Sequence, residues 1–579
     1  MRIRHLVGGA VTTALVGATL VAGGPVTGAG AATSAPVDAG RTTAPTDYVV
    51  LYERGASDAA ARAAIADAGG TVTTSNAKVG YAVARSSAGD FSTRATASDV
   101  LVGAARNRSI GTAPDAQRPA RTDVERQEAA RTAARTERGA ASVRAKAKAK
   151  NLKAGAEPLA DLQWDMRAIG ATAQGTHKTQ PGSKKVLVGV IDTGIDGSHP
   201  DIAPNFDAAD SRNFTRDMVD IDGPCEVTSC IDPADVDEDG HGTHVASTIG
   251  SPVNGLGVAG VAPDVTLVNI RAGQDSGYFF LQPTLDALTY AGDLGVDVVN
   301  MSFYVDPWLY NCTANPADSP AEQAEQRTIR EATQRALDYA RGKGVLPIAA
   351  AGNGATDLGK PTRDATSPDY PVGTERDRAI DNSCITVPTE SAGVVAVTST
   401  GISSRKAYYS DYGIEQADVA APGGDTYDTP NGRQDPKGAV LAAYPATLAV
   451  LNGDVDAAGN PTTPFVLKDC SGRVCGYYQY LQGTSMAAPH AAGVAALIVS
   501  EYGVRDPAHR GTLTLAPGRT EGLLTGTATD TACPTPATYT YRRVLASGAI
   551  RTSTATCEGT KDRNGFYGEG IISATAAVG

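Results

Sequence analysis

The sequence predicts a large open α/β domain over residues 158–579, because apolar runs of strand length alternate with helical patterns. The first run, KVLVGVID at 185–192, is continuously apolar and ends in an acid, as expected of a buried parallel strand. In open α/β sheets, ligands bind at the carboxyl ends of the strands, so these ends should hold the functional residues. Further strand-like runs lie at 265–272, 296–303, 344–353 and 393–400, with helical patterns at 282–294 and 321–343.

Residues 1–31 are typical of a secretory signal. A short basic start precedes an apolar stretch of small residues, and Ala29-Gly30-Ala31 offers a cleavage site. A transmembrane anchor is the weaker alternative, because five glycines thin the apolar run. We therefore expect a secreted, extracellular protein with no membrane association once the signal is removed.

Between the signal and the α/β domain, the sequence predicts a small folded unit and a linker. Residues 32–111 combine an extended run at 48–53, an Ala-rich helical stretch and an alternating pattern at 71–86, which indicates an α+β unit. Residues 112–157 are rich in Ala, Arg and Lys and nearly lack large apolar side chains, so they cannot build a core. This order suggests a pro-region joined by a basic linker that is open to cleavage, although an accessory domain would have the same arrangement.

Charge is distributed unevenly along the 579 residues. The chain has a formal net charge of −12 although basic residues outnumber acidic ones up to residue 157, so the large domain is strongly acidic. An acidic, exported domain argues against nucleic-acid binding.

Cysteine is present in an even number that fits an oxidising compartment. Eight cysteines permit four disulfides, but sequence order alone does not prove their pairing. Zinc is the competing interpretation of the short gaps, yet no second cysteine pair or suitably spaced histidines accompany them. The favoured pairs are Cys225 with Cys230, Cys470 with Cys475 and Cys533 with Cys557, which leaves Cys312 and Cys384.

Residues 481–502 place one hydroxyl, Ser485, where a turn of small residues enters an apolar helix. Gly483 permits an unusual turn, Pro489 suits a first helical turn, and the following Ala and Gly residues allow close packing on all sides. A serine there lies beside free backbone N–H groups that can hold an oxyanion. Taken alone, it would be interpreted as a helix cap.

Asp192 and His241 are the candidate partners of this serine. A serine nucleophile needs a base to take its proton and an acid to orient that base. His241 lies in a Gly-rich turn that leads into a small-residue helix, and Asp192 ends the first predicted strand. Zinc ligation by His241 and His244 is the alternative, although H-E-x-x-H is absent. The rival histidines are His199 and His490, of which His490 should be carried away from Ser485 by their shared helix.

Three motifs carry a family resemblance. Asp192-Thr-Gly-Ile-Asp, His241-Gly-Thr-His-Val-Ala and Gly483-Thr-Ser-Met-Ala-Ala-Pro-His occur in the order Asp, His, Ser. They resemble the active-site motifs of the subtilisin-like serine peptidases, and the resemblance extends over residues 160–579. It implies a doubly wound, mainly parallel sheet with helices on both faces. It also implies that Ser485 is the nucleophile, His241 the general base and then acid, and Asp192 the orienting acid.

The same resemblance implies how the protein works. We expect a monomeric serine endopeptidase that cleaves polypeptides through an acyl-enzyme, without a catalytic metal. The small unit ahead of the domain resembles the family's prodomain, which implies a self-processing zymogen that its own prodomain inhibits. Asn353, in Ala-Ala-Gly-Asn at a strand end, matches the family's oxyanion asparagine. Its alternative role is that of a turn residue.

The substrate-binding strand departs from the family pattern. The family usually has Ser-Leu-Gly-Gly, whereas this chain has Ser302, Phe303, Tyr304 and then Val305. Glycines at these positions let a substrate backbone lie close and keep the S1 pocket open. An aromatic insertion follows, which we expect a Cys312–Cys384 bridge to hold. We therefore predict a partly walled cleft that disfavours bulky P1 residues.

Calcium is the expected structural cofactor. Gln163, Asp201 and the loop 252–258 around Asn254 match positions of the family's tight calcium site, and hard oxygen ligands suit this ion. A second acidic group is interpreted as a solvated loop. Its members are Asp232, Asp235, Asp237 and Asp239.

Two other functions compete with the peptidase. A catalytically silent binding protein could retain the fold, but all four expected catalytic positions are occupied. An esterase could use the same serine, but the G-x-S-x-G elbow and the order Ser, acid, His of the α/β-hydrolases are both missing.

Overall fold

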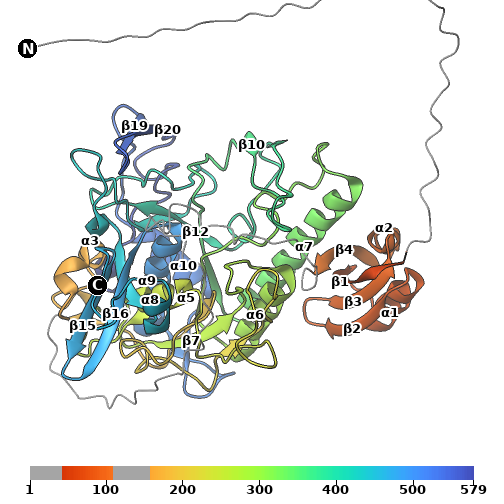
Figure 1. Ribbon diagram of the computed structural model, residues 1–579, viewed down its shortest axis with the longest axis horizontal. Coiled ribbons are helices and arrows are strands. Elements are labelled where there is room, and N and C mark those ends of the chain that lie inside the picture. The colour runs from red at the N-terminus through yellow and green to blue at the C-terminus, as the bar shows by residue number, and fades with distance from the viewer. Residues whose placement is uncertain (1–41, 108–156) are drawn as a thin grey trace, which may run out of the picture. The chain divides into compact units, whose positions relative to one another are not determined.

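The computed structural model describes residues 42–107 and 157–579 (Figure 1). The predicted signal at 1–31, the start of the predicted prodomain and nearly all of the linker lie outside these residues. Thr42–Gly579 forms one compact unit. Within the described residues, no helix is long and apolar enough to cross a membrane.

A seven-stranded sheet forms the centre of the α/β domain, and all its strand pairs are parallel. Its order is β13-β12-β9-β8-β5-β7-β6, so the chain moves outward in both directions from β5. Such a switch point opens a crevice at the carboxyl ends of the strands. The strands are β5 (Leu187–Ile191), β6 (Arg212–Asn213), β7 (Thr266–Arg271), β8 (Val298–Met301), β9 (Leu346–Ala350), β12 (Val395–Thr400) and β13 (Val419–Pro422).

Helices cover both faces of this sheet, which confirms the predicted doubly wound fold. Alternate strand residues enter different cores: Val298 packs with helix α9, whereas Val299 packs with α6 and α7. Helix α7 begins with a capping box between Ser319 and Glu322, which satisfies its first free backbone N–H groups. The helices of this domain are α3 (Trp164–Ile169), α4 (Thr176–Thr179), α5 (His241–Gly250), α6 (Leu281–Leu294), α7 (Pro320–Gly342), α8 (Ala446–Leu451), α9 (Thr484–Tyr502), α10 (Pro517–Gly526) and α11 (Ala574–Val578), with short 3-10 turns at Ala160–Leu162 and Pro436–Gly438.

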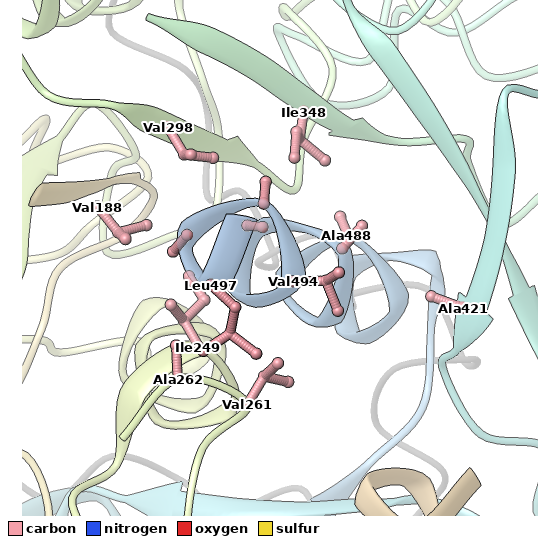
Figure 2. Close-up of a cluster of buried hydrophobic side chains, with 14 of the residues drawn as sticks. Val188, Ile249, Val261, Ala262, Val298, Ile348, Ala421, Ala488, Val494 and Leu497 are labelled. Carbon is pink, nitrogen blue, oxygen red and sulfur yellow. The ribbon is translucent and has the colours of Figure 1, made fainter. Parts of the chain in front are cut away.

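Helix α9 is the buried helix that the sequence predicts. Every residue from 484 to 499 is buried, and Figure 2 shows the helix between sheet residues such as Val298 and residues such as Ile249 of α5. Small residues make this possible, because a Cβ on Gly493 would lie only 2.5 Å from Cβ of Val261. A helix that is apolar all round belongs in the interior of a large domain.

The N-terminal unit is a four-stranded antiparallel sheet, ordered β2-β3-β1-β4, with two helices. The predicted strand at 48–53 lies in β1, and the alternating pattern at 71–86 is a hairpin rather than one strand, because Asn76–Gly80 turns the chain back. The elements are β1 (Thr42–Tyr52), α1 (Asp58–Asp67), β2 (Thr71–Asn76), β3 (Tyr81–Ala88), α2 (Phe91–Thr96) and β4 (Leu101–Asn107).

Antiparallel additions surround the central sheet. The largest is a three-stranded sheet, β14-β16-β15, whose middle strand leads directly into α9. The additional strands are β10 (Arg363–Asp364), β11 (Arg378–Ala379), β14 (Val440–Tyr444), β15 (Val466–Ser471), β16 (Val474–Leu481), β17 (Val504–Arg505), β18 (Leu513–Thr514), β19 (Thr538–Val544) and β20 (Ile550–Thr556).

The four disulfides join the cysteines as the sequence favours. They are Cys225–Cys230, Cys312–Cys384, Cys470–Cys475 and Cys533–Cys557.

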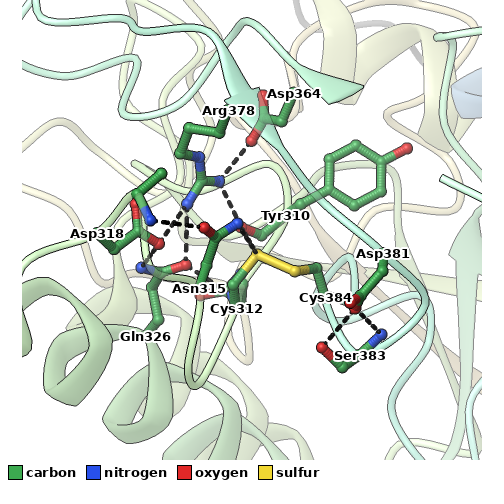
Figure 3. The surroundings of a disulfide bond; sticks show 12 residues. Tyr310, Cys312, Asn315, Asp318, Gln326, Asp364, Arg378, Asp381, Ser383 and Cys384 are labelled. Atoms are coloured by element: carbon green, nitrogen blue, oxygen red, sulfur yellow. Dashed lines mark hydrogen bonds and ion pairs between the residues drawn. A yellow bond between two sulfur atoms is a disulfide. The ribbon is translucent and has the colours of Figure 1, made fainter. Parts of the chain in front are cut away.

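The Cys312–Cys384 bridge lies in a tightly bonded insertion (Figure 3). The guanidinium of the fully buried Arg378 donates to the carboxylates of Asp318 and Asp364 and lies over the Trp308 ring at 4.8 Å. Two charge-assisted hydrogen bonds and a cation–π contact compensate the burial of this cation. The insertion that follows the substrate-binding strand is therefore a fixed structure.

Candidate active site

Asp192 and His241 meet at the switch point of the sheet. Asp192 directly follows β5 and is fully buried, and its Oδ1 lies 2.7 Å from His241 Nδ1. His241 begins α5 after Gly240, whose φ of 93° is a left-handed conformation that suits glycine. The carboxylate thus fixes the ring orientation and favours a proton on Nδ1, which leaves Nε2 to accept one.

Ser485 is the second residue of α9 and is 3% exposed. Pro489 lies four residues later, within the helix, and has no N–H to donate to the Ser485 carbonyl. The Ser302 hydroxyl takes that role and donates to the carbonyl at 3.0 Å, while Asn300 Nδ2 donates to the same hydroxyl at 2.9 Å. The end of β8 is therefore bonded to the start of α9.

Asn353 is fixed to the same helix start. It follows β9, and its Oδ1 accepts from the Thr484 N–H at 2.9 Å and from the Thr484 hydroxyl at 3.0 Å. The Gly352 N–H donates in turn to Thr484 Oγ1. Because its oxygen faces Thr484, the amide NH₂ of Asn353 is directed away from Thr484, as an oxyanion donor requires.

The rival histidines are engaged elsewhere. His490 lies with Nε2 3.1 Å from Asp165, and His199 Nε2 lies 3.0 Å from the Tyr477 carbonyl. His244 Nε2 contacts two backbone carbonyls, and burial lowers the pKa of His244 to about 3. A neutral His244 held by two carbonyls is a packed residue, which disfavours zinc binding with His241.

Two supporting residues were not identified from the sequence. Asp237 is buried and accepts from the Gly240 N–H, the Thr243 N–H and the Thr193 hydroxyl, so it joins the Asp192 and His241 motifs. Thr484 orients Asn353, as described above. Neither role has a local sequence signal, because each depends on contacts between segments far apart in the chain.

The predicted substrate-binding residues lie next to this centre. The Phe303 ring stacks on Phe279 with centroids 4.1 Å apart. The half-buried Tyr304 donates its hydroxyl to Asp369 at 2.5 Å. Burial raises the pKa of Tyr304, and the charge of Asp369 adds to that effect. Tyr304 is therefore a neutral donor held against the insertion.

The residues predicted to bind calcium come together, but their oxygens accept N–H bonds. Asp201 Oδ1 accepts from Asn254 Nδ2 at 2.9 Å, its Oδ2 accepts from the Val258 N–H at 3.0 Å, and Gln163 pairs with the backbone of Ala259. Among the described residues, only Oδ1 of Asn254 lacks a partner in this group. Calcium takes six to eight oxygens, so this arrangement does not fit the ion unless the loop rearranges.

Two more carboxylates hold the same loop. Glu157 accepts from the Gly255 N–H at 2.8 Å, and Asp469 accepts from the Gly257 N–H at 2.8 Å. We call Glu157, Asp201 and Asp469, with the loop 254–258 that they bind, the carboxylate socket.

The second acidic group is not the solvated loop that the sequence suggested. Asp232, Asp237 and Asp239 are buried, and only Asp235 is partly exposed. Their burial depends on β7, where Arg271 approaches Asp232 at 3.1 Å.

Comparisons with known proteins agree with this geometry. The sequence profile of the subtilase family matches residues 183–547. Subtilisin DY from Bacillus licheniformis is 28% identical over 321 residues, which cover 55% of this chain and 77% of that protein. The thermophilic serine proteinase of Bacillus sp. (strain AK1) is also 28% identical over 321 residues, which cover 55% of this chain but only 53% of that protein.

A solved structure supports the same fold. The epidermin leader peptide processing serine protease from Staphylococcus aureus matches with a TM-score of 0.58 at 19% identity, over 93% of this chain and 98% of that chain. At this identity the likeness concerns the fold alone.

Proposed function

Because the chain belongs to the subtilase family of serine peptidases, we propose that it cleaves polypeptides with Ser485 as nucleophile, His241 as general base and Asp192 as orienting acid. The contact of 2.7 Å between Asp192 and His241 carries the assignment. It gives the imidazole the tautomer that a base needs, at the sheet edge where ligands bind. The start of α9 brings Ser485 to that edge.

The proposed reaction follows from these positions. His241 Nε2 takes the Ser485 hydroxyl proton as the oxygen attacks the scissile carbonyl, and Asp192 stabilises the imidazolium. The Asn353 amide and the N–H groups at the start of α9 donate to the oxyanion. His241 then gives its proton to the leaving amine, and a water hydrolyses the acyl-enzyme through the same base.

We further propose that the protein is a secreted, monomeric zymogen that its N-terminal unit inhibits. The leader-like segment 1–31 and the position of the unit support this proposal. So do the contacts of the unit with α6 and α7: Asn107 Nδ2 donates to Gln282 at 2.6 Å, and Arg335 donates to the Tyr52 carbonyl at 2.6 Å. Such contacts hold the unit on the enzyme before cleavage.

Calcium remains the proposed structural cofactor. The site at Gln163, Asp201 and Asn254 stays a prediction, because the socket described above uses most of its oxygens. A different group of oxygens is better suited to the ion and is the subject of the next subsection.

Replacing the nucleophile tests the function. Ser485→Ala should lower peptide hydrolysis by at least about 10⁴-fold, abolish labelling by a fluorophosphonate and leave the precursor unprocessed. Ser500→Ala is the matched control, because Ser500 lies on the same helix and bonds only to the Ala496 carbonyl. Peptidase activity retained by Ser485→Ala would refute the mechanism, and labelling without peptide cleavage would favour an esterase. A wild-type protein that neither reacts nor cleaves would favour a silent binding protein.

Specificity tests the role of Tyr304. Wild-type enzyme should disfavour Phe and Leu at P1, and Tyr304→Gly should raise kcat/KM for them by about 10–200-fold, the usual discrimination of a pocket by size. Tyr304→Phe removes the bond to Asp369 but keeps the ring, so it separates volume from anchoring. A wild-type preference for Phe or Leu would show that Tyr304 does not block the pocket.

A further inference from the structure

Five carboxylates converge beside the end of β7. They come from the loop before His241 and from the segment that follows β7. Within each of two overlapping groups that share Glu226, one oxygen per residue lies within 4.8 Å of the others. We call this set the acidic cluster: Asp217, Glu226, Asp232, Glu238 and Asp275.

Asp217 shows that the cluster lacks a partner. Its side chain is only 7% exposed, and neither carboxylate oxygen has a hydrogen-bond partner among the described residues. Asp232 Oδ2 and Glu238 Oε2 also lack hydrogen-bond partners there. A buried carboxylate without donors is costly, so a ligand that satisfies Asp217 would stabilise the fold.

Arg271 compensates only part of this charge. Its guanidinium lies 3.1 Å from Asp232 and 2.5 Å from Asp275, and it is fully buried. One guanidinium faces five carboxylates, and both of its ion pairs are with residues other than Asp217 and Glu226. A divalent cation at Asp217 and Glu226 would supply the missing positive charge.

The ligand chemistry selects the ion. All five side chains offer hard carboxylate oxygens, and none is a nitrogen or sulfur ligand, which suits calcium. Calcium binds oxygen at 2.3–2.6 Å, so oxygens on opposite sides of one ion are about 4.6–5.2 Å apart, compatible with the spread in the cluster. Magnesium gives up its waters reluctantly and should bind more weakly.

We propose that the acidic cluster binds a calcium ion through Asp217, Glu226 and Asp232, with Glu238 and Asp275 closing the site on the Glu226 side. The surrounding structure supports a built site. The Cys225–Cys230 disulfide closes a short ring that carries Glu226, and the Asp217 N–H donates to the Cys230 carbonyl. The ion would tie the loop that precedes His241 to the end of β7.

Calorimetry on the full chain tests the proposal. Ser485→Ala in the same chain prevents self-cleavage, and the protein is stripped with EDTA, dialysed and titrated with CaCl₂. We expect saturable calcium binding and a rise in melting temperature, with a much weaker response to MgCl₂. Asp217→Asn and Glu226→Gln should each weaken the calcium Kd at least about tenfold. Asp235→Asn, in the same loop but outside the cluster, should bind as the parent does.

The outcomes separate the possible sites. Glu226 is exposed, so Glu226→Gln should fold even if Asp217→Asn does not. Calcium binding that is unchanged in both variants but lost in Asp201→Asn would place the ion in the carboxylate socket and overturn the proposal. No calcium response up to about 10 mM, beyond the range of weak extracellular sites, would also overturn it.

Discussion

The carboxylate socket and the acidic cluster bury acids in opposite ways. In the socket, Asp201 is fully buried and each of its oxygens accepts an N–H bond, while Glu157 and Asp469 bind the N–H groups of neighbouring loop residues. In the cluster, Asp217 is almost as deeply buried, yet neither of its oxygens has a hydrogen-bond partner among the described residues. Both regions are acidic in sequence, but only one supplies its own donors.

This difference teaches that donors, rather than the number of acids, decide where a cation is needed. Backbone N–H groups can satisfy a buried carboxylate as a metal would, provided that the loop turns them inward. Gly257 makes this possible in the socket, because its φ of 60° is left-handed and a Cβ there would lie only 1.9 Å from the Tyr478 hydroxyl oxygen. The following predictions test the contrast between the two regions.

The largest expected effect follows loss of the central socket acid. Asp201→Ala leaves the Val258 N–H and the Asn254 amide without acceptors in a buried site, at about 1–3 kcal/mol each. We expect the free energy of unfolding to fall by about 3 kcal/mol or more, measured by urea denaturation of the Ser485→Ala chain. Asp161→Ala, at an exposed acid nearby, is the control. A loss below 1 kcal/mol would show that the socket contributes little.

An intermediate effect is expected when the socket loop is blocked. Gly257→Ala should destabilise by about 2 kcal/mol or more, because it adds a steric clash to the strain of a left-handed conformation. Gly453→Ala separates the two causes, since Gly453 has φ of 71° and no atoms within 4 Å of an added Cβ. We expect about 1 kcal/mol there. Equal losses in both variants, compared by melting temperature, would contradict close packing at Gly257.

The smallest effect concerns pH. Burial raises the pKa of Asp201 well above its usual value, and the charge of Glu157 adds to this. Because the folded pKa is the higher one, this group's stabilisation is complete below the unfolded pKa of about 3.9 and declines as pH rises toward the folded pKa. Asp201→Asn cannot ionise, so relative to the parent it should gain about 1 kcal/mol between pH 4 and pH 8.

Urea denaturation at both pH values, in EDTA, measures this gain. If the variant instead becomes less stable than the parent at pH 8 and loses its calcium response, Asp201 is a metal ligand. The contrast drawn above would then be wrong.

Much of the fold and of the candidate site could be predicted from the sequence. Asp192 and Asn353 end continuous apolar runs, and such runs specify buried parallel strands and their carboxyl ends. Ser485 begins a helix whose apolar residues face in all directions, which identifies it as buried. These are local patterns, and local patterns determine where elements begin and end.

Contacts between distant segments could not be predicted. The hydrogen bonds of Thr484 with Asn353 and of Ser302 with Ser485 join residues more than a hundred positions apart. The acidic residues before His241 looked solvated because their burial depends on Arg271 of β7. Donor supply around Asp201 and Asp217 likewise depends on tertiary structure, so the sequence could not distinguish the two regions.

The bond from the Ser302 hydroxyl to the Ser485 carbonyl has a consequence for protein engineering. The strand that would select the substrate is physically attached to the helix that carries the nucleophile, through the position where Pro489 withholds its own donor. Substitutions that widen the cleft at Ser302 would also shift the reactive oxygen. Libraries that seek a new substrate range in this scaffold should therefore keep Ser302 and vary Tyr304 and the bridged insertion, where shape can change without moving the attacking group.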